Sequence, residues 1–214
     1  TEKGCDVYTT FSVSTQKAAY ESLEGYDGAA FIMNPDTGAI LAMASRPSYD
    51  PLTIDTKWED IINDSSDSRL VNRATQGKYI PGSIFKIVTT LDYMRENKNY
   101  NKFNYYCDGK ARFKGFSIKC FDGTAHGSED LTEAFAHSCN SAFSTIGDKL
   151  DVTKYRKTAE DLLFNKDLPL DIDYNQSVFA LDSTSTQFDI TQTSIGQGKT
   201  TVSPAHMAMI ASAI

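Results

Sequence analysis

The stretch of sequence that decides the interpretation is Tyr79-Ile80-Pro81-Gly82-Ser83-Ile84-Phe85-Lys86. A Pro-Gly pair followed by an apolar run predicts a turn and then a helix over residues 81–95. Because that helix is apolar over most of its circumference, we expect it to be buried. Ser83 and Lys86 are three residues apart, so they should lie on one face of the helix, near its N-terminus.

This pair has the chemistry of an activated nucleophile. A serine hydroxyl reacts poorly at neutral pH unless a neighbouring group takes its proton. Lysine can be that group only when burial lowers the pKa of its amine. The apolar neighbours that would bury it are Ile84, Phe85, Ile87 and Val88. The helix N-terminus beside Ser83 would also stabilise an oxyanion.

The same spacing occurs a second time, at Ser14 and Lys17. We interpret that pair as a helix cap followed by a surface lysine, because Ser-x-x-Lys is a loose pattern that arises by chance. The pair at Ser83 and Lys86 differs in its context. Lysine is almost never fully buried, so its presence in a buried core helix indicates a function.

Ser138-Cys139-Asn140 forms a second candidate element of the site, in a break between two predicted helices. The hydroxyl of Ser138 could relay a proton to a leaving amine, and the amide of Asn140 could bind a substrate carbonyl and orient the lysine. The alternative is a plain turn between helices, because Ser and Asn favour turns.

A third candidate is a cysteine cluster. Four cysteines occur, and Cys139 is interpreted as a small buried residue. For Cys107, Cys120 and His126 three interpretations stay open: a disulfide between the cysteines, a zinc site completed by a nearby carboxylate, or unlinked thiols.

Working outward, alternation at residues 7–13 predicts a strand, and Ser14 should cap a helix over residues 15–23 that ends at Gly25. Two apolar runs at 29–33 and 39–44 flank a turn and predict a β-hairpin. Further predictions are loops over 46–80, loops with short strands over 98–129, and a polar, loop-rich stretch over 165–198 that includes the tight loop Gly196-Gln197-Gly198. The remaining predictions are helices from a cap at Asp130 to about His137, over 142–150, over 152–164, and from Ser203 onward.

Composition limits the kinds of partner. The 214 residues are 40% hydrophobic and 23% charged, as in a globular domain with a sizeable core. The net charge of −7 excludes a typical nucleic-acid binder. No apolar run approaches the roughly 20 residues that cross a bilayer. Because the chain begins at Thr1 rather than Met, we expect it to be an excerpt of a longer protein.

Over nearly its whole length the sequence resembles the penicillin-binding transpeptidases, most closely those of the monofunctional, class B type. Ser-x-x-Lys and Ser-x-Asn are two of the three motifs of that family. The stretches that carry the resemblance include residues 28–38, 42–47, 72–74, 79–86, 126–127, 138–140 and 196–204, in family order and spacing.

The resemblance implies an α/β fold of the serine transpeptidase and β-lactamase type, with an antiparallel sheet flanked by helices and a helical sub-domain. The chain would be a partial transpeptidase domain. Residues 1–80 would belong to the α/β part and residues 81–214 mostly to the helical sub-domain. The third motif, Lys-Thr/Ser-Gly, is absent, so we expect it and three sheet strands to follow Ile214 in the parent protein. The isolated chain should then have little activity.

The implied reaction is D,D-transpeptidation. Ser83 would attack the D-Ala-D-Ala bond of a peptidoglycan stem peptide, with Lys86 as base, Ser138 as proton shuttle and Asn140 as substrate ligand. An amine of a neighbouring stem peptide would resolve the acyl-enzyme, and β-lactams would acylate Ser83. No cofactor is required, and zinc is the one candidate. The implied location is the outer face of the cytoplasmic membrane, with a single-pass anchor and other cell-wall synthesis proteins as partners. A β-lactam sensor domain and a class D-like serine β-lactamase remain alternatives.

Overall fold

A computed structural model describes residues 4–63 and 68–214 of the chain and divides them into two compact units. The first unit comprises the described residues up to Tyr79 together with 168–176 and 203–214, and the second comprises 80–167 and 177–202. The last helix, which we expected with the helical part, therefore groups with the first unit. No helix in the described ranges is both long enough and apolar enough to cross a membrane.

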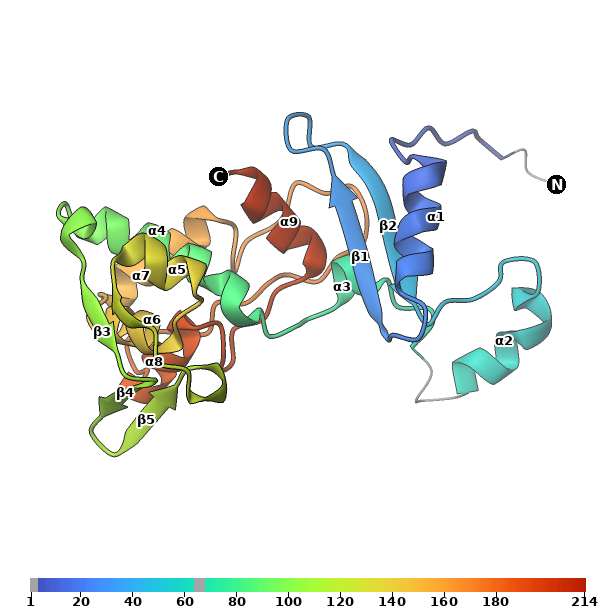
Figure 1. Ribbon diagram of the computed structural model, residues 1–214. Helices are drawn as coiled ribbons and strands as arrows, with labels where there is room; N and C mark the ends of the chain where they lie inside the picture. Colours follow the sequence, from blue (N-terminus) through green and yellow to red (C-terminus); the bar gives the residue numbers. More distant parts are fainter. Residues whose placement is uncertain (1–3, 64–67) are drawn as a thin grey trace. The chain divides into compact units, whose positions relative to one another are not determined.

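The first unit is built on the predicted hairpin (Figure 1). Strands β1 (Gly28–Met33) and β2 (Ile40–Arg46) pair antiparallel, with Phe31 opposite Met43 and a register shift between Ile32 and Met33. The turn between them is held by the side chain of Asn34, which accepts hydrogen bonds from the backbone of Asp36 and Thr37.

Helices α1 (Val13–Ser22) and α9 (Pro204–Ser212) contact β2 and β1, respectively. The side chain of Gln16 fixes α1 against the sheet, because it both donates to and accepts from the backbone of Met43, at 2.9 and 2.8 Å. Ala19 packs there with Ala42 and Ala44. The last helix starts as expected, with Ser203 as N-cap and Pro204 in the first turn.

The N-terminal prediction was wrong in two respects. Residues 7–12 form no strand, and Val7 and Tyr8 are 84% and 93% exposed. Alternation predicts a strand only where another strand pairs with it, and none does so within the described part of the chain. Helix α1 also starts two residues earlier than predicted, because Ser12 rather than Ser14 caps it.

Two helices lie where loops were expected in the first unit. They are α2 (Ile54–Asn63) and the short α3 (Arg73–Gln76), which Asn72 caps. The apolar side chains of α2 recur at helical spacing, but the turn residues around it obscured that signal. Residues 64–67 of the predicted loop lie outside the described residues.

The second unit holds the candidate site. A 3₁₀ turn (Gly82–Phe85) leads directly into α4 (Lys86–Glu96), so the predicted helix is real but its first turn is tighter than an α-helix. Helices α6 (Asn140–Gly147), α7 (Val152–Asp161) and α8 (Gln187–Ser194) complete the helical core. Helix α7 ends three residues earlier than predicted. Helix α8 was not predicted from the sequence, because this helix is rich in Thr and Ser, which favour turns, although Thr186 and Asp189 form a capping box at its start.

Aromatic packing forms the centre of this unit. The buried ring of Phe85 lies 5.6 Å from that of Phe164 and 6.2 Å from that of Phe179. Tyr155 of α7 packs 5.1 Å from Phe179 and hydrogen-bonds to Thr89 of α4 at 2.6 Å. Because Phe85 immediately precedes Lys86, this core fixes the backbone that carries the lysine.

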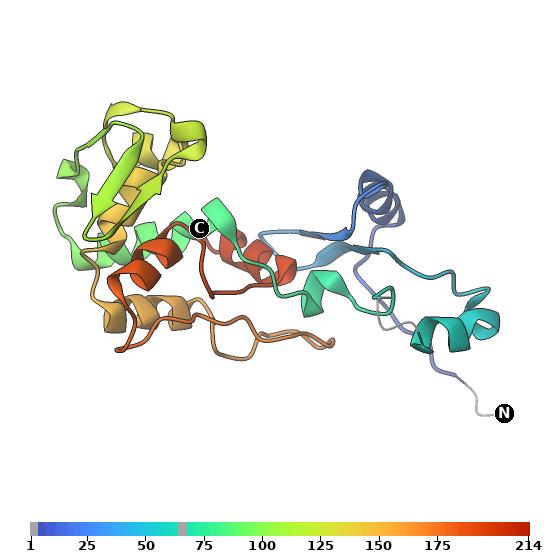
Figure 2. The same ribbon diagram turned by 90° about the horizontal axis from the view of Figure 1, so that it is seen from below.

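Short strands and one small helix surround α6. Strand β3 (Tyr105–Cys107) pairs with β6 (Gly127–Glu129), and β4 (Lys110–Phe113) pairs with β5 (Phe116–Lys119). The β4–β5 hairpin packs on α6, as both views show (Figures 1 and 2). Helix α5 (Leu131–Ala136) starts in the predicted capping box of Asp130 and Glu133.

Candidate active site

Lys86 is the centre of the site, and only 1% of it is exposed. Its amine donates to Ser83 Oγ at 3.0 Å, to Ser138 Oγ at 3.0 Å and to the carbonyl oxygen of Ser138 at 3.1 Å. A fourth acceptor, Asn140 Oδ1, lies at 2.8 Å. The four residues predicted from the sequence are therefore brought together by one amine.

The surroundings of the amine make it easier to deprotonate than an exposed lysine. Burial lowers the pKa of Lys86 from 10.5 to about 8, against the opposing effect of the thiols of Cys139 and Cys120. Among the described residues, no carboxylate is a hydrogen-bond partner of the amine. A neutral amine has a lone pair that can accept the proton of Ser83, as a general base must.

The source of this burial differs in part from the prediction. Phe85 and Val88 are fully buried as expected, but Ile84 is 51% exposed and points away from the core. Phe143 of α6 takes its place, with its ring centroid 5.7 Å from the amine. Ser83 itself is exposed, as a nucleophile that receives a substrate must be.

The Ser138-Cys139-Asn140 turn is shaped by its backbone and by its middle residue. Ser138 has a φ of 52°, in the left-handed region, just before α6 begins. Cys139 is buried and caps α6, accepting from the backbone of Ala142. Asn140 donates its amide to the carbonyl oxygen of Lys119 at 3.2 Å, which leaves its own oxygen to Lys86. The turn therefore not only joins two helices but also brings Ser138 and Asn140 to the amine of Lys86.

A cavity of about 410 Å³ opens in front of these groups. Its lining comes entirely from the second unit: Ser83, Phe121, Thr124, His126, His137, Ser138, Asn140, Ile195 and Gln197. Both histidines were outside the predicted set of catalytic residues. No spacing in the sequence connects them to Ser83. His126 immediately precedes β6 and His137 immediately follows α5, so the fold of these elements places them in the cavity wall.

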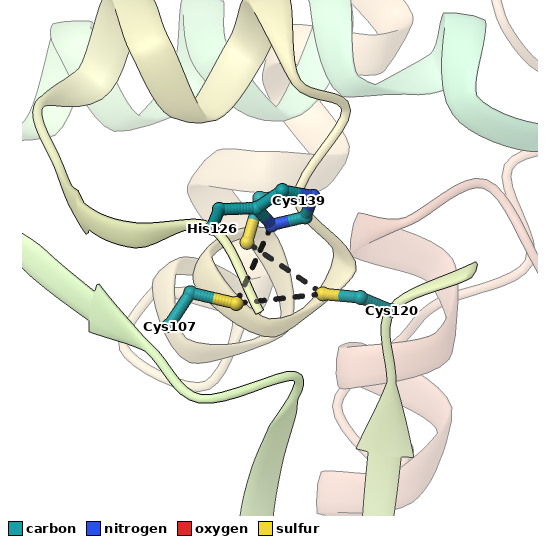
Figure 3. A group of neighbouring side chains, drawn as sticks. All are labelled: Cys107, Cys120, His126 and Cys139. Carbon is teal, nitrogen blue, oxygen red and sulfur yellow. Dashed lines mark hydrogen bonds between the residues drawn. The ribbon is translucent and has the colours of Figure 1, made fainter. Parts of the chain in front are cut away.

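The cysteine cluster lies directly behind the turn (Figure 3). Cys107, Cys120 and His126 meet as predicted, but the fourth member is Cys139 rather than a carboxylate. Sγ of Cys120 is 3.7 Å from Sγ of Cys107 and 3.7 Å from Sγ of Cys139, and His126 Nδ1 is 3.4 Å from Sγ of Cys107. The disulfide, one of the three interpretations left open by the sequence, is not formed in this structure, because a bonded pair would be about 2 Å apart.

The thiols of this cluster differ in acidity. Burial raises the pKa of Cys139 and of Cys120. At Cys107 burial acts in the same direction, but backbone hydrogen bonds from His126 and Gly109 prevail and lower the pKa to about 7. Three thiols and an imidazole within 4.8 Å of one another could hold a metal ion.

This geometry agrees with a comparison against known families. The sequence model described as "Penicillin binding protein transpeptidase domain" matches residues 28–214. The chain belongs to this family.

Relatives of the chain include a protein named as a peptidoglycan transpeptidase and one named as a sporulation protein. The chain is 30% identical to "Peptidoglycan D,D-transpeptidase PbpA" of Mycolicibacterium smegmatis over 237 residues, covering 99% of this chain and 46% of the relative. It is 29% identical to "Stage V sporulation protein D" of Bacillus subtilis over 188 residues, covering 86% and 28%. The chain thus spans less than half the length of these curated relatives.

Solved structures of the family share the fold. The D,D-transpeptidase domain of a peptidoglycan glycosyltransferase from Eggerthella lenta matches 95% of this chain and 52% of that chain, with a TM-score of 0.85 and 29% identity. Penicillin-binding protein A from M. tuberculosis, solved as an imipenem acyl-enzyme complex, matches 95% and 50%, with a TM-score of 0.84 and 26% identity. The predicted fold class, a serine transpeptidase fold of the class B type, is confirmed.

Proposed function

We propose that the complete protein is a D,D-transpeptidase that cross-links peptidoglycan stem peptides through an acyl-enzyme on Ser83. The observation that carries this proposal is the amine of Lys86, which is buried and lies 3.0 Å from the hydroxyl of Ser83. In the family, related proteins are named as D,D-transpeptidases, and one was solved with β-lactams bound as acyl-enzymes.

The acylation step follows from the contacts of Lys86. Its neutral amine takes the proton of Ser83 while Oγ bonds to the carbonyl carbon of the D-Ala-D-Ala peptide bond. The backbone amide at the start of the helix lies beside the developing oxyanion. As the peptide bond breaks, Ser138, whose hydroxyl lies 3.0 Å from the amine, gives its proton to the leaving nitrogen of the terminal D-Ala and receives in return the proton that Lys86 took from Ser83.

The second half of the reaction reverses the first with a new amine. An amine of a neighbouring stem peptide bonds to the acyl carbon, the ester bond to Ser83 breaks, and the proton of the amine returns to Ser83 through Ser138 and Lys86. Asn140, held by the carbonyl of Lys119, retains one amide hydrogen for a substrate carbonyl.

Labelling with a fluorescent penicillin tests this function. In the complete protein, the label should reach a peptide that contains Ser83 and persist, and Ser83→Ala should abolish it. Ser14→Ala is the matched control, because Ser14 has the same spacing to a lysine but lies on α1. Absence of label in the complete wild-type protein would refute the proposal, and rapid release of the penicillin would favour the β-lactamase alternative.

We further propose that the protein acts at the outer face of the cytoplasmic membrane, held by a single-pass anchor, together with other cell-wall synthesis proteins. Peptidoglycan stem peptides are cross-linked outside that membrane, so the substrate class supports this location. Protease added to intact spheroplasts should remove the domain, and complete protection of the domain would contradict the location.

We also propose that the cysteine cluster holds zinc. A tetrahedral ion with Zn–S bonds of about 2.3 Å separates its sulfur ligands by about 3.8 Å, close to the two Sγ distances of 3.7 Å. Such an ion would be structural, because four protein ligands leave no open position. It would hold Cys107, Cys120 and His126 around Cys139, the middle residue of the catalytic turn.

Metal analysis of the purified complete protein tests the zinc site. We expect one zinc per chain, lost in Cys120→Ser and retained in the control Cys5→Ser, since Cys5 is exposed and lies in the first unit. Mass spectrometry that finds no zinc and a disulfide between Cys107 and Cys120 would overturn this proposal.

A further inference from the structure

His137 forms part of the wall of the catalytic cavity and is held in place from behind. Its Nδ1 lies 2.8 Å from Oε1 of Glu129, and Glu129 is fully buried while the side chain of His137 is 51% exposed. The ring of His126 stacks on it, with centroids 5.4 Å apart and planes inclined by 14°. Glu129 and His126 therefore fix the ring of His137, and the ring edge opposite Nδ1 can contact a ligand.

The hydrogen bond to Glu129 decides which ring nitrogen of His137 remains available to a ligand. A carboxylate only accepts, so Nδ1 must be the donor. Nε2 is then the ring nitrogen left to meet a molecule in the cavity, which His137 lines together with Ser83 and Ser138. A buried carboxylate that orients an exposed imidazole is a common way to present a ring nitrogen to a substrate.

The position of His137 beside Ser138 indicates which substrate it meets. The leaving nitrogen receives its proton through Ser138, so that nitrogen must lie close to the Ser138 hydroxyl. Transpeptidation uses the same path in reverse, and the attacking amine must occupy the place that the leaving amine vacates. His137 immediately precedes Ser138 and lines the same cavity.

We propose that His137 is a binding residue for the acceptor amine, with Nε2 hydrogen-bonding to the amine-bearing group that resolves the acyl-enzyme, and that Glu129 is its positioning residue. This inference rests on the proposed transpeptidase function. In the step concerned, the amine nitrogen bonds to the acyl carbon, the ester bond to Ser83 breaks, and the proton lost by the amine returns to Ser83. His137 orients the amine and does not take its proton.

The division of one acyl-enzyme between aminolysis and hydrolysis distinguishes amine binding by His137 from a purely structural role. The complete protein is acylated by an N-acyl-D-alanyl thioester, and the acyl group is then released either to water or to added D-alanine as the amine. For His137→Ala we expect the ratio of aminolysis to hydrolysis to fall about tenfold, with weaker dependence on D-alanine concentration. His137→Gln should restore part of the ratio, because its amide reaches a similar place.

Two further variants complete the design. Glu129→Gln should lower the same ratio less than His137→Ala does, because it weakens the hold on the ring without removing it. Thr132→Ala is the control, since Thr132 is exposed on α5 and outside the cavity lining. An unchanged ratio in His137→Ala overturns the proposal, whether acylation proceeds at the wild-type rate or more slowly. If penicillin fails to label Ser83 in the wild-type protein, the proposed function and this inference both fall.

Discussion

Gly82, the residue before Ser83, donates its backbone N–H to the carbonyl oxygen of Gly196 at 2.8 Å. Gly196 has a φ of 76°, and a Cβ there would lie 1.7 Å from the carbonyl oxygen of Gly82. The Gly196-Gln197-Gly198 loop therefore supports the turn that carries the nucleophile, and its first glycine is required because no side chain fits between the two backbones.

Gly196→Ala tests this relationship. We expect it to destabilise the complete protein by about 2–4 kcal/mol, because it combines an unfavourable φ with a clash against backbone, and to slow penicillin acylation. Gly198→Ala is the control: its φ is 89°, but a Cβ there meets only ordinary contacts, the nearest at 3.6 Å. Thermal melting should show a smaller loss for Gly198→Ala, of about 1 kcal/mol. Equal losses in the two variants would contradict the role of the clash.

Replacing Lys86 with methionine should stop the chemistry while keeping the fold. Methionine fills most of the volume of the lysine stem and needs no hydrogen bonds in a site that is 1% exposed. We expect penicillin acylation to slow about 10³-fold, within the range of lost general-base catalysis. Lys17→Met is the control, because Lys17 is an exposed residue whose partner is Glu21. Acylation of Lys86→Met at more than a tenth of the wild-type rate would exclude Lys86 as the base.

The rate of acylation should depend on pH through the same amine. The pKa of Lys86 is lowered to about 8 by burial, so below pH 8 most molecules carry the inactive ammonium. The rate constant for penicillin acylation should rise about tenfold per pH unit up to about pH 8 and then level off. A rate that stays constant between pH 6 and 8 would contradict a neutral lysine base.

The same shift makes a prediction about stability. The pKa of Lys86 is about 8 in the folded protein, and the ordinary value of 10.5 applies to the unfolded chain, so between these pH values the unfolded chain binds more protons. The contribution of Lys86 to the free energy of unfolding must therefore rise with pH from about 8 to 10.5. Urea unfolding at several pH values should show this rise in wild type and lack it in Lys86→Met.

Asp92 offers a test of buried charge away from the site. It is fully buried on α4, where it accepts a hydrogen bond of 2.6 Å from Thr158, and burial raises its pKa from 3.8 to about 6. A raised pKa in an acid means that stability falls as pH rises from 3.8 to 6. Asp92→Asn should therefore stabilise the protein at pH 7 by about 1–3 kcal/mol, with no gain below pH 4.

Asp161 supplies the opposite control. It pairs with Arg95 and Lys157, and its pKa is lowered, chiefly by the hydrogen bond from Lys157. Asp161→Asn should therefore leave the stability at pH 7 unchanged or reduce it slightly, because exposed ion pairs contribute little. Thermal melting at pH 7 should show a gain of stability for Asp92→Asn and no gain for Asp161→Asn. A loss of stability in Asp92→Asn would contradict the destabilising effect of its buried charge.

Local chemistry made several elements predictable. The β1–β2 hairpin follows from two apolar runs around a turn, and the helices that begin at Asp130 and Ser203 follow from their capping residues. Each of these signals lies within a few residues of the element it predicts. The alternation at residues 7–13 failed because a strand needs a partner that the local sequence does not supply.

The sequence by itself determined that Ser83 and Lys86 meet, because one helical turn brings residues three apart together whatever the rest of the chain does. Only the tertiary structure decided that the amine is buried, that residues 138–140 face it, and that Cys139 closes the cluster behind them. The contacts of Lys86 with Ser138 and Asn140 join residues more than fifty positions apart in the sequence. The packing of α4 against α6 sets these contacts, and no local spacing encodes that packing.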